Sequence, residues 1–185
     1  MAAYKTYCES VLDKDDTNVH KIYHDTEYGF PIDNDNDLFG RLILEINQAG
    51  LSWTTILNKK QNFYKAYAKF NIKKVANFNE ADRKRLLNDA GIIRNKLKVN
   101  AAIHNAQQVL KLQKEFGSFK AWLDHHHPKE KMEWVKLFKK TFKFTGGEIT
   151  NEFLMSTGYL KGAHDKTCPI YQKILNHKPM WLSPS

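Results

Sequence analysis

The sequence predicts an all-α fold. Valine and isoleucine nowhere alternate with polar residues for long enough to indicate a β-strand. Apolar residues instead recur at the spacing that places them on one face of a helix, and glycine, proline and asparagine separate these stretches. With 185 residues and no internal repeat or low-complexity linker, the chain can bury a core and fits one domain, or one domain with a small lobe. We expect a single helical domain over 1–185.

The first expected helix is short and lies near the N-terminus. It follows an acidic, polar loop at 13–18 and ends near His24. A turn at 27–31 comes next, because Gly29 can adopt a positive φ and Pro31 prevents a helix from continuing.

The next two helices are separated by a glycine turn. N-cap candidates at 33–37 precede a helix over about 36–48, whose apolar residues fall on one face. Gly50 ends this helix in the manner of a C-terminal glycine. Another helix begins near Ser52, and aromatic residues at helical spacing continue it to Phe70. Further helices are expected over 72–75, 81–87, 96–116, 119–124, 134–140 and 148–156.

The charge of the chain favours a polyanionic partner. There are 29 lysines and arginines against 20 aspartates and glutamates, a net charge of +9 with histidine neutral. Positive side chains that contact phosphates release condensed counterions, although many basic proteins bind no nucleic acid. No apolar run is long enough to cross a bilayer, and the N-terminus lacks the apolar core of a signal peptide. We therefore expect a cytoplasmic protein with no membrane partner.

Residues 81–106 have the layout of a helix-hairpin-helix. One helix breaks at a turn that contains Gly91, and a second helix begins at once. Such a turn aims free backbone N–H groups at one phosphate, and Arg94, Lys96 and Lys98 add positive charge beside it. The same spacing also fits a plain connection between two helices with a glycine cap.

A carboxylate and a tryptophan flank the Gly50 turn. Glu45 follows Leu42 by three residues and so shares the helix face that should turn inward. A buried carboxylate must find hydrogen-bond donors, because an unpaired charge is costly to bury. With Trp53 as a stacking surface, the pair suits a cationic or amino-bearing purine. The alternative is an ion pair between Glu45 and a lysine or arginine beside a core tryptophan.

The two cysteines, Cys8 and Cys168, stand near opposite ends of the chain. A reducing cytoplasm argues against a structural disulfide between them. His164 precedes Cys168 by four residues, so both could face one metal ion. Cys8 and His24 would then complete a tetrahedral set of two cysteines and two histidines. Two unrelated buried thiols are the alternative, since the N-terminal spacing is longer than in standard zinc fingers.

These three patterns occur together in one known family. The chain resembles 3-methyladenine DNA glycosylase I, a bacterial family among the helix-hairpin-helix glycosylases. The resemblance extends from about Cys8 to Cys168, and its most specific block is Q-A-G-L-S-W at 48–53. The other matching segments are 23–29, 89–94 and 142–146, followed by His164 and Cys168.

The resemblance implies a helix-hairpin-helix DNA glycosylase fold with one structural Zn²⁺. This ion would tie the N-terminal segment 8–24 to the C-terminal segment 164–168. The implied ligands are Cys8, His24, His164 and Cys168.

The resemblance also implies a pocket for an extruded base. Glu45 would hydrogen-bond the methylated adenine, Trp53 would stack on it, and Tyr23 would line the pocket. Gly50 and Leu51 would fill the space that the nucleotide leaves in the duplex.

The same resemblance assigns the DNA backbone to the hairpin. Gly91, Arg94 and Lys96 would contact the phosphates. The implied partner is double-stranded alkylated DNA, the implied product is free 3-methyladenine, and the protein is expected to act as a monomer.

The expected reaction is hydrolysis of the N-glycosidic bond of 3-methyladenine by base flipping, a step of base-excision repair. Methylation makes the adenine cationic and weakens this bond, so the enzyme mainly has to extrude the nucleotide and hold the base. Many relatives in the wider superfamily use an aspartate after the hairpin, but residues 141–156 contain none. Glu45 is therefore the catalytic candidate, as a base-reading group first and an electrostatic helper second. No lyase activity is expected, because the block 45–53 contains no lysine to act as a nucleophile.

Some positions depart from the usual family pattern. Asn151 and His20 stand where tyrosines are frequent, and Glu148 adds a carboxylate near the expected pocket wall, as an extra acid/base group or a surface substitution. Two rival functions stay open: a glycosylase of the same fold for another damaged base, and a non-catalytic protein that binds damaged DNA. A zinc hydrolase is disfavoured, because four protein ligands leave no open position for water.

Overall fold

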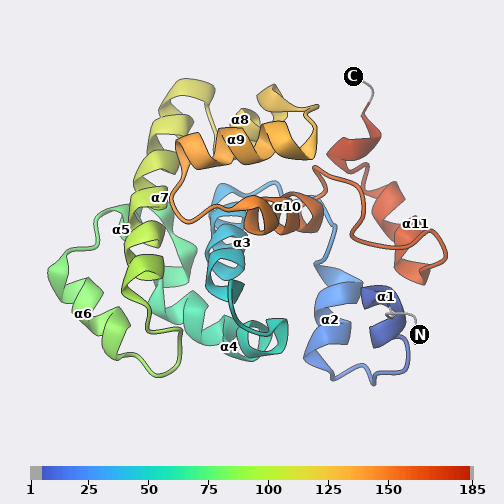
Figure 1. Ribbon diagram of the computed structural model, residues 1–185, viewed down its shortest axis with the longest axis horizontal. Helices are drawn as coiled ribbons and strands as arrows, with labels where there is room; N and C mark the ends of the chain where they lie inside the picture. The colour runs from blue at the N-terminus through green and yellow to red at the C-terminus, as the bar shows by residue number, and fades with distance from the viewer. Residues whose placement is uncertain (1–5, 184–185) are drawn as a thin grey trace. The chain divides into compact units, whose positions relative to one another are not determined.

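The computed structural model describes residues 6–183, and this part of the chain consists of helices and turns without a β-strand (Figure 1). The prediction of an all-α fold is therefore confirmed. The α-helices are α1 (Tyr7–Val11), α2 (Val19–Thr26), α3 (Asp35–Gln48), α4 (Trp53–Ala66), α5 (Ile72–Ala76), α6 (Glu80–Asn88), α7 (Lys96–Phe116), α8 (Phe119–His126), α9 (Lys131–Thr141), α10 (Gly147–Ser156) and α11 (Pro169–Asn176). Two short 3-10 helices are η1 (Ala68–Phe70) and η2 (Met180–Leu182). Within the described range, every helix is too short or too polar to cross a membrane.

α3 and α7 begin at asparagine N-caps. The side chains of Asn34 and Asn95 each accept hydrogen bonds from the backbone N–H groups two and three residues later. Such a cap satisfies donors that the first turn of a helix leaves without partners. This local signal explains why the expected ranges 36–48 and 96–116 agree with the structure within one residue.

Two expectations differ from the structure. α4 ends at Ala66 rather than continuing to Phe70, because residues 68–70 take positive φ angles of 50°, 59° and 56°. The helical pattern also does not predict α1 and α11, which have only five and eight residues. Local features begin them instead: a capping box at Thr6 for α1, and Pro169 in the first turn of α11.

The chain divides into two compact units. The smaller unit combines the residues up to Pro31 with those from Leu154 onward, and the larger unit spans Ile32–Phe153. The expectation of a single domain over 1–185 stays a prediction. The smaller unit therefore needs interactions that join the two ends of the chain.

The larger unit is built around α3, whose inward face is fully buried. α7 runs beside α3 and also contacts α5, α6 and α8 (Figure 1). The side chains of this face are at most 1% exposed, as their helical spacing predicts: Leu38, Phe39, Leu42, Ile43 and Ile46. Burial of each contributes roughly 1.5–3 kcal/mol before entropy costs.

Packed aromatic rings fix α8, α9 and the segment that follows α9. The ring centroids of neighbouring members lie 5.4–6.0 Å apart. The members are Phe119, Trp122, Phe138 and Phe142. This cluster holds the start of the loop between α9 and α10 in place.

The smaller unit has a small core that contains both cysteines. Cys8, Cys168, Ile170 and Ile174 are buried together, and three aromatic side chains pack against them, those of Phe30, Tyr171 and Trp181. The same unit also buries Val11, Tyr23, Leu154 and Tyr159.

Candidate active site and metal site

The four side chains expected as metal ligands lie together in the smaller unit. Cys8 comes from α1, His24 from α2, and Cys168 directly precedes α11, with His164 four residues before it. All four are buried, and one potential ligand atom of each lies within 4.8 Å of all the others. The Cys168 sulfur lies 3.5 Å from Nδ1 of His164 and 3.6 Å from Nε2 of His24. The Cys8 sulfur lies 3.6 Å from the same Nδ1 of His164.

Neighbouring hydrogen bonds orient both imidazoles toward the sulfurs. Nε2 of His164 lies 2.8 Å from the carbonyl oxygen of Tyr28, and Nδ1 of His24 lies 2.6 Å from a carboxylate oxygen of Asp25. Each ring therefore carries its proton on the far side and presents a lone pair to the cluster. The backbone N–H of Asp165 donates to the sulfur of Cys8 at 3.5 Å.

The electrostatics of the cluster favour a bound cation. Burial raises the pKa of the Cys8 thiol to about 12 and lowers the pKa of the His164 imidazole to about 4. The imidazole is therefore neutral, as a ligand must be, and a cation bound to the sulfurs would offset the cost of ionising the thiols. Two sulfurs and two nitrogens are the donors that a closed, four-coordinate metal site uses. The residues present thus fit a metal ion.

The block 45–53 forms the end of α3, a turn and the start of α4. Glu45 is 4% exposed, as its helical spacing predicts. Gly50 takes a φ of +79°, which lets the chain turn away after the last residue of α3. The hydroxyl of Ser52 caps the first turn of α4, and Trp53, the first residue of α4, is half-buried. The carboxylate and the indole thus flank one fixed turn.

Leu51 stands exposed on this turn in a fixed position. Its exposed fraction is 38%. Its N–H donates to the carbonyl oxygen of Gln48 at 2.7 Å, and its own carbonyl oxygen accepts a bond from the Gln48 side chain at 3.0 Å. Two hydrogen bonds to one residue therefore hold the backbone while the apolar side chain faces solvent.

The hairpin joins α6 to α7 through residues 89–95. The Asp89 side chain accepts a hydrogen bond from the N–H of Gly91 at 2.8 Å. A Cβ atom on Gly91 would lie 2.9 Å from that carboxylate oxygen, so a larger residue here would displace the Asp89 side chain. The N–H groups of Ile92 and Asn95 also donate to carbonyl oxygens within the hairpin. The N–H of Gly91 therefore already has an acceptor within the hairpin.

Other N–H groups of the hairpin are available to an anion. Among residues 6–183, the backbone N–H groups of Ile93, Arg94 and Lys96 have no acceptor. They lie at the N-terminus of α7, where the helix dipole favours negative charge. The predicted phosphate contact of Arg94 and Lys96 is thus geometrically possible through their main chain as well as their side chains.

A family model described as methyladenine glycosylase matches residues 13–137. This chain belongs to that family. The matched range includes His24, Glu45, Trp53 and the hairpin but ends before His164 and Cys168. The metal cluster is therefore supported by its own geometry rather than by this match.

Curated relatives and a solved structure agree with the family. The chain is 34% identical to DNA-3-methyladenine glycosylase 1 of Escherichia coli (strain K12) over 168 residues, 80% of this chain and 89% of the relative. It is 31% identical to DNA-3-methyladenine glycosylase of Haemophilus influenzae over 170 residues, 82% of this chain and 92% of the relative. It is also similar to 3-methyladenine DNA glycosylase I from Staphylococcus aureus, with a TM-score of 0.77 and 32% identity over 85% of this chain and 92% of that one. That solved structure is described as the structural basis of 3-methyladenine recognition.

Lys98 of this methyladenine glycosylase family member does not add surface charge beside the hairpin, so that expectation is wrong. Lys98 is only 4% exposed, and its Nζ donates to the carbonyl oxygens of Asn47 and Ala49 at 2.8 and 2.7 Å. The physical reason is its place on α7, where it shares the buried face with Ala102 and Asn105. The carbonyls that it binds end α3 and have no partner within that helix.

Glu148 is a surface residue. Its side chain is 86% exposed and lies 3.6 Å from Nζ of Lys131. Such a solvated carboxylate fits a surface substitution and not an additional acid/base group.

Tyr23 is buried on α2, in the smaller unit, whereas Glu45 and Trp53 belong to the larger one. Its part in a base pocket stays a prediction.

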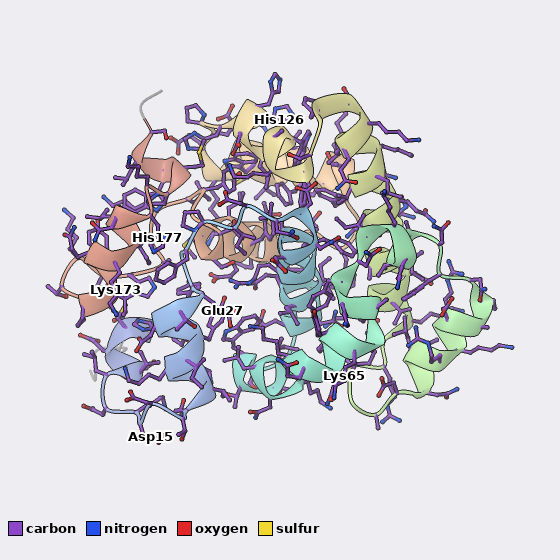
Figure 2. All side chains as sticks on the ribbon, turned by 180° about the vertical axis from the view of Figure 1, so that it is seen from behind. Asp15, Glu27, Lys65, His126, Lys173 and His177 are labelled. Carbon is purple, nitrogen blue, oxygen red and sulfur yellow. The ribbon has the colours of Figure 1, made fainter. Side chains whose placement is uncertain are left out.

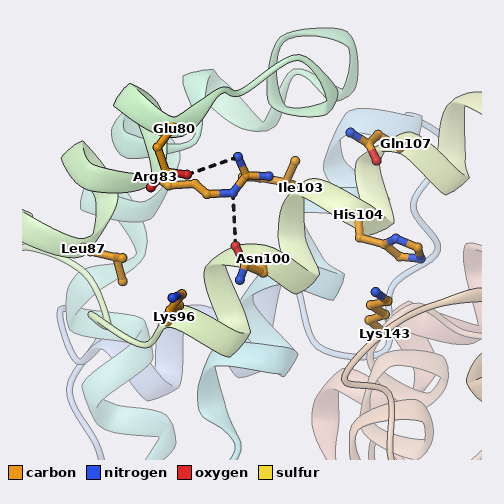
Figure 3. Close-up of a pocket in the computed structure, with 9 residues that line it drawn as sticks. All are labelled: Glu80, Arg83, Leu87, Lys96, Asn100, Ile103, His104, Gln107 and Lys143. Carbon is orange, nitrogen blue, oxygen red and sulfur yellow. Dashed lines mark hydrogen bonds and ion pairs between the residues drawn. The ribbon is translucent and has the colours of Figure 1, made fainter.

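A positively charged groove of about 440 Å³ lies between α6 and α7, next to the hairpin (Figure 3). Nε of Arg83 donates to the Asn100 side chain at 3.1 Å, and its guanidinium lies 3.8 Å from the carboxylate of Glu80. Burial, followed by the charges of nearby lysines, lowers the pKa of His104. The lining residues are Glu80, Arg83, Leu87, Lys96, Asn100, Ile103, His104, Gln107 and Lys143.

Replacement of Asp25 by asparagine should weaken metal binding. The change removes the charge that orients His24, and loss of such a partner costs roughly 10- to 100-fold in metal affinity. Competition between the protein and a chelating dye for Zn²⁺ or Co²⁺ measures this affinity. Asp16→Asn is the matched control. Both aspartates lie near Nζ of Lys21, Asp25 at 2.6 Å and Asp16 at 3.9 Å, but the Asp16 side chain is 97% exposed. Equal affinities of the two variants would contradict the role of Asp25.

Proposed function

We propose that this protein is a monofunctional DNA glycosylase, acting as a cytoplasmic monomer, that flips 3-methyladenine out of alkylated double-stranded DNA and hydrolyses its N-glycosidic bond. Membership of the methyladenine glycosylase family and the likeness to relatives named for this lesion support the substrate. The structural observation that carries the proposal is the block 45–53, which combines a buried carboxylate, an exposed leucine and a half-buried tryptophan around one turn.

Release of this base does not require protonation by a general acid. The N3-methylated adenine is cationic, so when the bond between C1′ and N9 breaks, the electron pair stays with the base and the base leaves neutral. The sugar becomes an oxocarbenium-like cation until water adds and releases a proton. In our proposal, Glu45 accepts a hydrogen bond from the base, and its charge stabilises the developing positive charge. Trp53 supplies the stacking surface, and the assignment of Tyr23 to the pocket rests on the sequence resemblance alone.

Leu51 and Gly50 suit the space that an extruded nucleotide leaves. An apolar side chain inserted there offsets part of the lost stacking, which costs a few kcal/mol. The two hydrogen bonds between Gln48 and Leu51 support this role, because they hold the turn in shape before it meets DNA.

We further propose that the hairpin and the adjoining groove contact the DNA backbone. The N–H groups of Ile93, Arg94 and Lys96 would hold one phosphate. The groove would take neighbouring phosphates of the same strand along α7, where Arg83 and Lys143 supply positive charge. The +9 charge of the chain is consistent with this partner.

We propose Zn²⁺ as the ion of the cysteine and histidine cluster. The donor set and the hydrogen bonds that orient both imidazoles support this choice. Four protein ligands leave no open position for water, so the ion would stabilise the fold and take no part in hydrolysis. It would join α1 and α2 to the segment before α11.

Release of free base from alkylated duplex DNA tests the proposed function. Chromatography of the released bases should find 3-methyladenine. No release at saturating protein would overturn the proposal and favour a protein that only binds damaged DNA. Release of a different alkylated base alone would keep the activity and change the lesion.

Glu45→Gln should weaken the binding of free 3-methyladenine. Hydrogen bonds to charged groups contribute roughly 1.5–3 kcal/mol, which corresponds to roughly a tenfold to hundredfold loss of affinity. Titration calorimetry or ligand fluorescence measures it. Glu148→Gln is the matched control, since the Glu148 side chain is 86% exposed. Unchanged affinity of the Glu45 variant would remove this residue from the pocket.

Lys143→Gln should reduce the salt dependence of binding to undamaged duplex DNA. Loss of one phosphate contact lowers the slope of log affinity against log salt by about 0.9. Fluorescence anisotropy at several salt concentrations gives the slope. Lys65→Gln is the matched control, because Lys65 is exposed at the end of α4 and does not line the groove (Figure 2). If both variants keep the slope of the unmodified protein, the groove does not contact DNA.

A further inference from the structure

Two lysines link the turn between α3 and α4 to the hairpin between α6 and α7. The first is Lys98 on α7, whose Nζ donates to the carbonyl oxygens of Asn47 and Ala49. The ring of Phe144 lies 5.8 Å from the ammonium nitrogen. Burial lowers the pKa of Lys98, and an apolar side chain of similar length would fill this space without the cost of burying a charge. A lysine here therefore does more than fill the core.

The second is Lys59 on α4, which bonds in the opposite direction. Its Nζ donates to the carbonyl oxygens of Ala90 and Gly91 at 2.9 and 3.3 Å. The side-chain amide of Asn62, on the same helix, also donates to the Gly91 carbonyl at 3.3 Å. Each segment thus holds the main chain of the other, and we call Lys59 and Lys98 the lysine clamp.

The clamp connects two parts of the protein with different proposed tasks. α7 begins at Lys96, whose N–H is proposed to bind a phosphate, and Lys98 follows two residues later. α4 begins at Trp53, directly after the turn that carries Leu51, and Lys59 lies six residues further on. The path from the phosphate-binding hairpin to the turn proposed to enter the duplex therefore passes through hydrogen bonds to main-chain carbonyls.

We propose that Lys59 and Lys98 are positioning residues that hold the hairpin and the turn between α3 and α4 at a fixed separation while the nucleotide is extruded. This inference rests on the proposed function. Extrusion works against base stacking and pairing, so the duplex pushes back on the turn that enters it. A rigid link to the hairpin transmits this force to the DNA backbone, whereas a loosened link lets the turn retreat. Both ammonium groups donate to main-chain carbonyls, so we expect the clamp to leave the affinity for free 3-methyladenine unchanged.

Single-turnover base release by the full-length protein tests the clamp. One alkylated strand is annealed either to its full complement or to a complement with abasic sites opposite the adenines, where extrusion costs less. For Lys59→Met and Lys98→Met we expect the rate on the paired duplex to fall roughly 10- to 100-fold, as misplaced catalytic geometry does. The rate on the second duplex should fall far less, and the affinity for free 3-methyladenine should stay the same.

Three further variants sharpen this test. Lys65→Met controls for the loss of a lysine from α4 and should match the unmodified protein. Lys59→Arg should restore most of the rate, because a guanidinium can donate to the same carbonyls. The double variant of Lys59 and Lys98 should lose less than the product of the single losses, since either change breaks the same link. If Lys98→Met does not fold, the less buried Lys59 still decides the outcome.

Each contrary result has a separate meaning. Equal losses on both duplexes, or a parallel loss of free-base affinity, would overturn the clamp and leave a general structural role. A borohydride-trapped covalent complex that disappears in Lys98→Met would assign Lys98 to lyase chemistry instead. No release from either duplex by the unmodified protein would overturn the proposed function and the clamp with it.

Discussion

The end of α3 is the constraint on which the larger unit depends. A helix leaves its last carbonyls without backbone donors, and in a protein interior these groups need another partner. Lys98 supplies it for Asn47 and Ala49. Because Lys98 belongs to α7, the same interaction that satisfies the end of one helix also sets the second helix beside it. Lys98 thus bonds the residues that lead into the Gly50 turn, and Lys59 on α4 bonds the carbonyl oxygens of the hairpin.

The smaller unit depends on a different interaction. Its helices come from segments of the chain that are far apart in the sequence, and its core contains both cysteines. In the larger unit, main-chain carbonyls bind the buried ammonium group of Lys98. In the smaller unit, ligand atoms of two cysteines and two histidines lie within 4.8 Å of one another. Tyr28 and Asp25 fix which nitrogen of each ring faces the sulfurs. Coordination of one metal ion by all four side chains would join these distant segments.

Part of this arrangement can be predicted from the sequence alone, and particular residues show which features cannot. The spacing from Leu42 correctly predicts that Glu45 faces inward, because period is a property of the helix itself. The convergence of Cys8 and His24 with His164 and Cys168 could be predicted only through the family resemblance, since the spacing left two buried thiols as an alternative. Lys98 was misplaced because a lysine is expected at the surface, and its true position depends on carbonyls about fifty residues away in the chain. The acceptor of the Gly91 N–H depends on the orientation of the Asp89 side chain, which no periodicity encodes.

The two halves of the metal cluster are separated in time as well as in sequence. A ribosome makes Cys8 and His24 first, then the whole of Ile32–Phe153, and only afterwards His164 and Cys168. Compact units fold as they emerge, so the larger unit can be complete while α1 and α2 still lack their partners. Until then the thiol of Cys8 is open to oxidation and to other metals. A chain that stalls before His164 would carry the complete larger unit without a closed cluster, so residues translated late decide whether Cys8 is protected.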